Sequence, residues 1–329
     1  MQTTATLNPI LTTIANQFMS DPKGFVANEI FPEFDAPFQS GAYYYFAPGD
    51  IVNVPVLGPR APGSPYTRLQ TKISNDSYAC ENYGVEAPAP DEERKKYATY
   101  FDLDKLKTNR IVDTERINRE LRAYALVTGT SVSGANIAIP WNDPTSNPKG
   151  DVDAAKEIIR QASGMRGLSL KMVISEPTFL TLQYHPKLVD LFKFTTPGVL
   201  NEDKLAAYFG IAKVCVAYNI QATNNEGATF SAADIWGNVA LLCSVTATQD
   251  LEVPTFGRTF KWTAFQTEVS IPTGGTGPAM TATGGGPDLM QIFTYRDETV
   301  KADVHRADQY LAEKLVAPGA GYLLKGCLA

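Results

Sequence analysis

The stretch Asp102–Thr128, DLDKLKTNRIVDTERINRELRAYALVT, determines how the rest of the chain is interpreted. Its second half repeats with steps of three and four residues, which places one face of a helix on Ile117, Leu121, Tyr124 and Thr128. Charged side chains are expected on the outer face, at Arg116, Arg119, Glu120 and Arg122. Gly129 marks the end of the helix. The spacing predicts one long helix, with a break near Asn109 as the alternative.

Composition and charge narrow the class of protein. Of the 329 residues, 44% are hydrophobic and 19% are charged, which is typical of an ordered chain of about two domains. The formal net charge is −6, and no run of five basic residues occurs. The chain therefore lacks the clustered Lys and Arg of a general nucleic-acid surface.

Four cysteines, Cys80, Cys215, Cys243 and Cys327, lie far apart and form no CxxC motif. This spacing favours reduced thiols, with Cys215 and Cys243 buried inside apolar runs. The first residues lack the basic region and unbroken apolar core of a signal peptide. Since no apolar run reaches the roughly 18 residues of a membrane span, we expect a soluble protein made in the cytoplasm.

Residues 1–35 are expected to form an N-terminal arm. Helical spacing of apolar residues occurs once in it, at Leu7, Ile10, Leu11, Ile14 and Phe18. Such a stripe packs either on the body of the same chain or on a neighbouring subunit.

Residues 36–92 combine many prolines and glycines with strand-like pieces such as AYYYF and IVNVPVL. This segment has too little periodic apolar sequence to build its own core. We expect an extended hairpin that either forms an ordinary β-rich subdomain or completes its fold against another molecule. Tyrosines suit such an interface, since the ring is apolar and the hydroxyl tolerates water. The candidate inter-subunit contacts are Tyr43, Tyr44, Tyr45, Phe46, Arg60, Tyr66, Arg68 and Lys72.

The block Asp91–Lys96, DEERKK, is most simply a solvated helix turn. A sharper alternative is that its opposite charges pair across a subunit boundary, although single surface pairs contribute only about 0–1 kcal/mol. The Pro-, Gly- and Ser-rich loop 131–150 follows the long helix and marks a boundary.

Residues 151–250 indicate a compact α/β unit. Asp151 or Asp153 caps a predicted helix, and LKMVIS (170–175) is a predicted buried strand. The apolar residues of that helix are Val152, Ala155, Ile158, Ile159 and Ala162. Further expected elements are a helix after Pro177, a short helix started by Asn201 or Asp203 and closed by Gly210, and strands at 212–218 and 237–245. The pattern is α+β or α/β around one small sheet.

The C-terminal part is less regular. Phe260 and Trp262 alternate with Lys261 and Thr263, which predicts a half-buried strand. The glycine-rich loop 273–287 follows, and the periodicity of 299–306 fits a strand and a helix equally well.

Signals of catalysis are sparse. His185 and His305 are the only histidines, and neither lies in a metal-binding spacing, so structural or surface roles are expected. There is no GxSxG motif, and the loop 273–287 lacks the Gly-Lys-Ser/Thr of a phosphate loop. We expect no catalytic residue, cofactor or metal.

The order of these parts resembles the tailed-bacteriophage major capsid proteins of the Hong Kong 97-like fold. The resemblance is carried by RINRELRAYAL (116–126), DAAKEIIRQASG with LKMVISEPTFLTLQYHPKL, PTFGRTFKW (254–262) and VKADVHRADQYLAEKLVAPGAGYLL. It implies an α+β fold with an N-terminal arm, an extended β-hairpin E-loop, a peripheral (P) domain with a long spine helix, and a compact axial (A) domain. The implied limits are 1–35 for the arm, 36–92 for the E-loop, 93–150 for the P-domain, 151–296 for the A-domain and 297–329 for a return to the P-domain sheet. It also favours a strand at 299–306.

The resemblance implies a shell subunit that is not an enzyme. Copies would assemble in the host cytoplasm into the hexamers and pentamers of an icosahedral virion, each E-loop lying over a neighbour. The implied partners are a separate scaffolding protein, a portal and a cement or decoration protein, and the shell would enclose DNA without sequence-specific binding. Lys72 is the only lysine in the E-loop, but nothing around it favours the Lys–Asn crosslink of some relatives.

Two alternatives are kept. The first is an encapsulin, a bacterial nanocompartment shell of the same fold that loads cargo enzymes. The second is a small-molecule enzyme housed in residues 151–250, which the scarcity of histidine and the lack of a phosphate or nucleophile motif disfavour.

Overall fold

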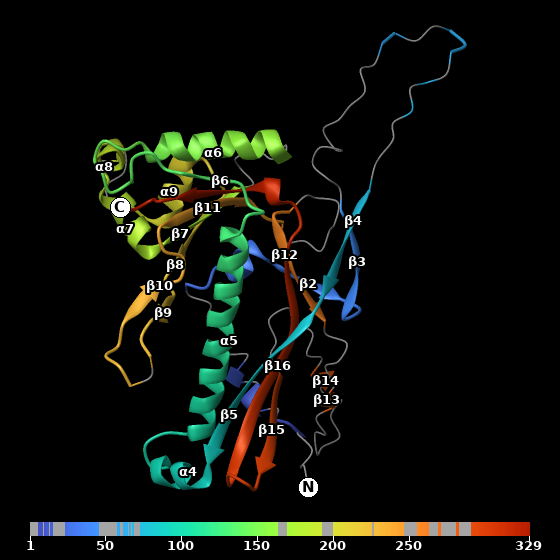
Figure 1. The fold of residues 1–329 in the computed structure, drawn as a ribbon, viewed down its shortest axis with the longest axis vertical. Coiled ribbons are helices and arrows are strands. Elements are labelled where there is room, and N and C mark those ends of the chain that lie inside the picture. The colour runs from blue at the N-terminus through green and yellow to red at the C-terminus, as the bar shows by residue number, and fades with distance from the viewer. Residues whose placement is uncertain are drawn as a thin grey trace.

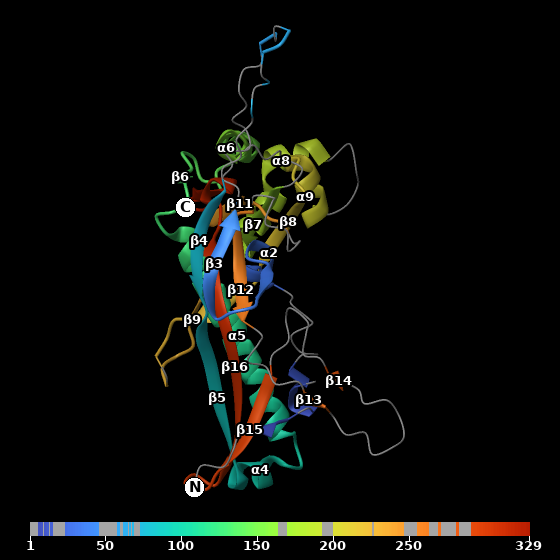
Figure 2. The same cartoon turned by 90° about the vertical axis from the view of Figure 1, so that its right-hand side faces the viewer.

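A single unbroken helix, α5 (Leu103–Thr128), runs through the computed structural model, with the long sheet along its side and the compact unit at one end (Figures 1 and 2). The side chain of Asp102 accepts hydrogen bonds from the backbone N–H groups of Asp104 and Lys105 and so caps the first turn. Gly129 follows the last turn. The long helix is confirmed, and Asn109 lies within it without a break.

The structure describes residues 6–8, 10–12, 14–15, 24–45, 58–59, 62–64, 66, 68, 73–163, 170–192, 200–225, 227–246, 255–262, 269–270, 281–282 and 291–329. No helix in these ranges combines the length and the apolar character that a membrane span requires.

The buried face of α5 differs from the predicted one. Ile111, Val112, Ala123 and Val127 are buried, whereas Ile117, Leu121 and Tyr124 are only partly buried against the core. Arg119 and Glu120 were expected on the outer face and are instead buried. The prediction was wrong here because both side chains have polar partners on distant segments.

The long sheet lies beside α5 (Figure 1). Its strand order is β1 (Thr6–Leu7), β15 (Gln291–Asp297), β16 (Ala302–Leu315), β12 (Gly257–Trp262) and β2 (Glu33–Ala36), and β5 (Glu81–Pro90) also pairs with β16. Only the β12–β2 pair is parallel within this sheet. The ambiguous stretch 299–306 therefore contributes to a strand, as the resemblance favoured.

Strand β12 is buried on both faces, which corrects the prediction of a half-buried strand. Lys261 and Arg258 are almost fully buried, as is Phe260 between them. Alternation of polar and apolar residues misled the prediction, because Lys261 has a carboxylate partner, Glu33, on the neighbouring strand.

The compact unit is built on a second sheet. Its strand order is β6 (Gly134–Asn136), β17 (Gly321–Lys325), β11 (Val239–Ser244), β7 (Leu170–Ser175) and β8 (Lys213–Ala217). Met172 and Ile174 pack in one core with the helices α6 (Pro148–Ser163), α7 (Glu176–Tyr184), α8 (Pro186–Phe192) and α9 (Glu202–Phe209). Val173 and Leu241 pack in a second core with α5 and the short helix α2 (Ala27–Ile30).

Local signals predicted this unit well. The limits of β7 agree with LKMVIS, Gly210 closes α9 with positive φ, and Asn201 caps it. Helix α6 differs, since it begins at Pro148 rather than at Asp151 or Asp153, and Ile158 is exposed. All four cysteines are free and buried.

Strands from distant parts of the sequence join these sheets. Strand β17 comes from the segment 297–329 and lies in the compact sheet, whereas β12 and all of β15 except Asp297 come from 151–296 and lie in the long sheet. The five-part division of the chain therefore stays a prediction, and the strands of its last two parts are shared between the two sheets.

Most of the described part of the N-terminal arm packs on its own chain, but Ile10 of the predicted stripe is 71% exposed. Leu11 and Ala15 contact a core that includes Ile111 and Val112 of α5. Leu7 belongs to strand β1 and not to the predicted helix, because its backbone pairs with Phe293. Phe18 lies outside the described residues.

Small elements complete the fold. They are α4 (Asp91–Tyr97), the 3₁₀ turn η2 (Pro318–Ala320), and three hairpins or pairs, β3 (Ser40–Tyr45) with β4 (Ser74–Ala79), β9 (Ile220–Ala222) with β10 (Ala232–Asp234), and β13 (Val269–Ser270) with β14 (Thr281–Ala282).

Candidate functional site

Both histidines are buried and lie against polar side chains of their own chain. His185 is buried with Nε2 3.1 Å from Oγ of Ser146, and burial lowers its pKa. His305 is also buried, between Asp104 and Thr294. Within the described ranges, no three His, Cys, Asp or Glu side chains gather in a way that could hold a metal ion.

An open pocket of about 500 Å³ lies between the segment that leads into α2 and strand β8. Its charged groups have partners within the chain. Glu29 accepts hydrogen bonds from Nζ of Lys171 and of Lys213 at 2.6 Å each, and Glu202 accepts one from the hydroxyl of Tyr218. The pocket therefore presents an ion pair and apolar walls, without histidine and without a cluster, among the described residues, that could hold a metal ion.

The β3–β4 hairpin carries the predicted contact residues that can be placed. Tyr44 and Tyr66 are 59% and 77% exposed, Arg68 is exposed, and Tyr45 is half-buried. Phe46, Arg60 and Lys72 lie outside the described residues. Tyr43 is the exception, because its ring is buried within its own chain.

Aromatic stacking fixes the base of this hairpin to the long sheet. The Phe260 ring lies 4.8 Å from the ring of Tyr43 and 4.6 Å from the ring of Tyr78. The Tyr43 hydroxyl donates a hydrogen bond to Asp76, and burial raises the pKa of Tyr43. The base of the hairpin is thus held in place, and exposed apolar side chains follow outward from it at Tyr44, Tyr66 and Ile73, while exposed Phe38 precedes β3.

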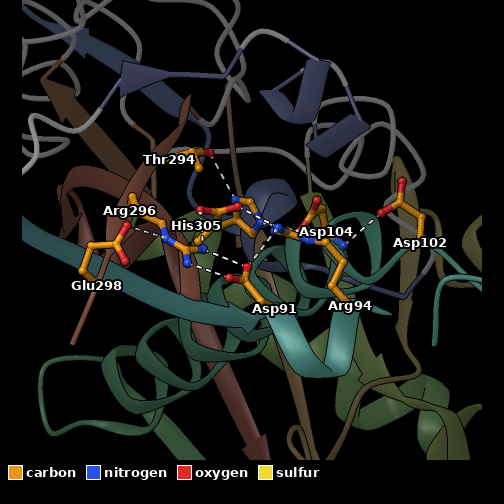
Figure 3. A network of polar contacts seen from close by, with 9 residues as sticks. Asp91, Arg94, Asp102, Asp104, Thr294, Arg296, Glu298 and His305 are labelled. Carbon is orange, nitrogen blue, oxygen red and sulfur yellow. Dashed lines mark hydrogen bonds and ion pairs between the residues drawn. The ribbon is translucent and has the colours of Figure 1, made fainter. Parts of the chain in front are cut away.

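A charged network holds the end of α5 that lies far from the compact unit (Figure 3). Arg94 of α4 donates to Asp104 of α5 at 2.8 Å and to Asp303 of β16 at 2.7 Å. Arg296 of β15 binds both carboxylate oxygens of Asp91, at 2.8 and 2.6 Å. Asp91 and Arg94 thus pair within the chain, whereas Glu92, Glu93, Lys95 and Lys96 are exposed, and pairing of this block across a subunit boundary stays a prediction.

The network shifts the pKa of its carboxyl groups. Burial alone would raise the pKa of Asp104, but hydrogen bonds from Arg94 and His305 hold it below its usual value. Arg296 lowers the pKa of Asp91 in the same way. Both carboxylates therefore stay ionised and keep α4 joined to α5, β15 and β16.

A second polar junction surrounds Glu120. Its Oε1 accepts hydrogen bonds from the backbone N–H groups of Val26 and Ala27, at 2.5 and 2.6 Å, and Oε2 accepts one from Nε1 of Trp236 at 2.7 Å. Burial raises the pKa of Glu120, and the three donors oppose that rise. One carboxylate thereby joins α2, α5 and the turn that precedes β11.

The seam between α5 and the long sheet is polar along its middle. Arg119 binds Glu33 of β2 at 2.5 Å, and Arg122 binds Glu313 of β16 at 3.0 Å. Glu115 is buried in the same seam, and burial, opposed by Arg122 and increased by Glu313 and Asp308, raises its pKa to about 6. Sequence reasoning missed this seam, because the partners Glu33 and Glu313 lie on segments far from α5 in the sequence.

Comparison with known proteins supports one fold. No family model matches the chain. The curated major capsid protein of Burkholderia phage BcepMu is 33% identical over 97 residues, which is 29% of this chain and 30% of that protein. The chain thus matches less than a third of the length of this curated relative.

Likeness to solved structures extends over the whole chain. A phage-related protein from Bordetella bronchiseptica RB50 covers 98% of each chain with a TM-score of 0.70 and 21% identity. A virus-like particle from Pyrococcus furiosus has a TM-score of 0.52 at 10% identity over 96% of this chain and 98% of its own. The capsid of cyanophage P-SCSP1u has a TM-score of 0.52 at 11% identity, over 89% and 86%. The Hong Kong 97-like α+β fold expected from the sequence is confirmed.

Proposed function

We propose that the chain is the major capsid protein of a tailed bacteriophage, a structural subunit and not an enzyme, found in the virion. The observation that carries this is the full-length capsid fold, together with the stretch of 97 residues related to a phage major capsid protein. A fold alone admits several functions, and the related stretch supplies the specific support.

The subunit assembles with copies of itself into hexamers and pentamers of an icosahedral shell. Support comes from the β3–β4 hairpin, whose base is fastened by Phe260 while Tyr44 and Tyr66 stay exposed. Exposed aromatic side chains on a rigid support are typical of interface anchors. Tyr44, Tyr66 and Arg68, with Phe46, Arg60 and Lys72, would contact a neighbouring copy.

The remaining partners follow from this role. Assembly in the host cytoplasm would use a separate scaffolding protein and a portal, and a cement or decoration protein would bind the finished shell. The net charge of −6 suits a container that encloses DNA without gripping it.

The second candidate is an encapsulin-type nanocompartment shell, favoured by the likeness to the virus-like particle from Pyrococcus furiosus. Neighbouring genes distinguish the two. Terminase, portal and tail genes beside this one support the phage head, and a cargo enzyme gene supports the compartment.

Replacement of residues 50–72 by a short Gly-Ser turn tests the role of the E-loop, because it keeps strands β3 and β4 and their pairing of Tyr45 with Ser74. The variant should stay soluble and melt like the wild type, yet form no particles in negative-stain microscopy when expressed with the scaffolding protein of its phage. Normal-sized particles from the variant would contradict the proposed contact. A wild-type chain that never assembles would contradict the shell function itself.

A further inference from the structure

The hairpin formed by β9 and β10 stands off the compact unit, on the side of α5 (Figure 1). From Ile220 to Ala233, every described residue is exposed except Asn224, which is half-exposed. Phe230 is 72% and Ile220 is 51% exposed. A two-stranded hairpin without a third strand or a helix behind it is marginally stable in water.

The hairpin lacks the features that protect an exposed edge. From Ile220 to Asp234, the ends of its two strands, Glu226 and Asp234 are the only charged residues in the sequence. Each of its two strands pairs only with the other among the described residues, so the outer edges of both are open. Natural proteins usually protect such edges with charges, prolines or a covering element. An open hairpin with only two charged residues and an exposed Phe indicates a surface that another chain covers.

The hairpin is nevertheless preformed. Thr223 N–H donates to the carbonyl oxygen of Ser231 at 2.8 Å, and their hydroxyl groups lie 3.0 Å apart. At its base, Nδ2 of Asn219 donates to the carbonyl oxygen of Gly24 at 2.6 Å, and Trp236 binds Glu120. A segment already held in shape loses little conformational entropy when it binds.

Its position favours a second copy of the same chain as the partner. The β9–β10 hairpin and the β3–β4 hairpin lie on opposite sides of the chain (Figure 1). A closed ring of identical subunits needs heterologous contacts, in which two different surfaces on opposite sides of each subunit meet. Both hairpins are poor in charge and carry exposed aromatic residues. Charge repulsion would therefore not oppose a contact between the β9–β10 hairpin of one copy and the β3–β4 side of the next.

We propose that the β9–β10 hairpin is a contact between copies, buried in the assembled shell against the neighbouring subunit on the side that carries that subunit's β3–β4 hairpin. This inference rests on the proposed shell function and adds to it a second projecting contact, on the opposite side from the E-loop. Ile220 and Phe230 are the apolar residues that become covered.

Thiol labelling tests the proposal directly, because the four native cysteines are buried. Thr229→Cys places a reactive thiol at the exposed end of the hairpin, and Gln161→Cys places a control thiol on the exposed face of α6. A maleimide should label Thr229→Cys at least about tenfold more slowly in particles than in free subunits, while labelling of Gln161→Cys changes little. Equal labelling of Thr229→Cys in both states overturns the proposal.

A substitution gives an independent measurement. Ile220→Ser with Phe230→Ser should leave the melting temperature of the free subunit unchanged, since both side chains are exposed, and should lower particle yield at least about tenfold. Ile158→Ser on α6 removes an exposed apolar side chain elsewhere and should assemble normally. Wild-type yield from the double variant argues against the contact. Failure of the wild-type chain to assemble would instead count against the shell function.

Discussion

The indole Nε1 of Trp236 donates a hydrogen bond to Oε2 of Glu120 at 2.7 Å, which joins the compact unit to the long helix. The other oxygen of the same carboxylate holds the first turn of α2. Three segments that are distant in the sequence therefore depend on one buried side chain.

Glu120→Gln should lower the free energy of unfolding by about 2–3 kcal/mol, because an amide has one acceptor oxygen and its NH₂ group must face an N–H donor. Denaturant unfolding at neutral pH measures the loss. Glu93→Gln, on the exposed side of α4, is the matched control and should change stability by less than about 0.5 kcal/mol. Equal stability of the two variants would show that the junction is not a structural support.

Glu115 should make stability depend on pH. Its pKa of about 6 in the folded chain lies above its ordinary value of 4.5, so the folded state binds the proton more tightly. Protonated Glu115 therefore makes its full favourable contribution to the free energy of unfolding below about pH 4.5, and this contribution is lost as the pH rises through 6. Glu115→Gln should raise stability at pH 7 by on the order of 1–2 kcal/mol and flatten the profile between pH 4.5 and 6. Thermal melts across this range measure both effects, and an unchanged slope would contradict the assignment.

Arg94→Met should destabilise the end of α5 that lies far from the compact unit, because it leaves Asp104 and Asp303 without a shared cation. The pKa of Asp104 is lower in the folded chain than its ordinary value of 3.8. Its ionised carboxylate therefore stabilises the folded chain at pH values above 3.8, and this stabilisation is lost as the pH falls through the folded-state pKa. The difference from the wild type should thus be largest near pH 7 and shrink in acid. Lys95→Met, which removes an exposed cation from the same helix, should show no such pH dependence.

Gly321→Ala should destabilise the chain by about 1–3 kcal/mol or more, because its new Cβ would overlap the buried ring of Phe256. Gly319→Ala is the matched control, since its Cβ would meet Cβ of Ala162 at an ordinary 3.4 Å. Soluble yield and melting temperature compare the two variants. A stable Gly321→Ala would show that the ring of Phe256 can move aside.

The sequence predicted one part of the candidate assembly surface, the tyrosine-rich segment, and missed the other, the β9–β10 hairpin. The tyrosine-rich segment was recognised by its composition, and Tyr44 and Tyr66 are indeed exposed. Tyr43 is buried because Phe260, more than 200 residues away in the sequence, stacks on it. The β9–β10 hairpin gave no signal, since exposure depends on what the rest of the chain leaves uncovered.

The sequence by itself determined the elements with local signals. Asp102 and Gly129 bound the long helix, LKMVIS forms strand β7, and Asn201 and Gly210 enclose α9. Caps and turns act between residues a few positions apart, so a single sequence is enough to locate them.

Only the tertiary structure decided which charged residues are buried. Glu120 meets Val26 across 94 positions, and Arg94 meets Asp303 across 209. Burial of a charge is favourable only where such partners converge, and a hydrophobic pattern along one segment carries no information about a partner on another. The fold of α5 was therefore readable from its own residues, while its buried face was set by the chain around it.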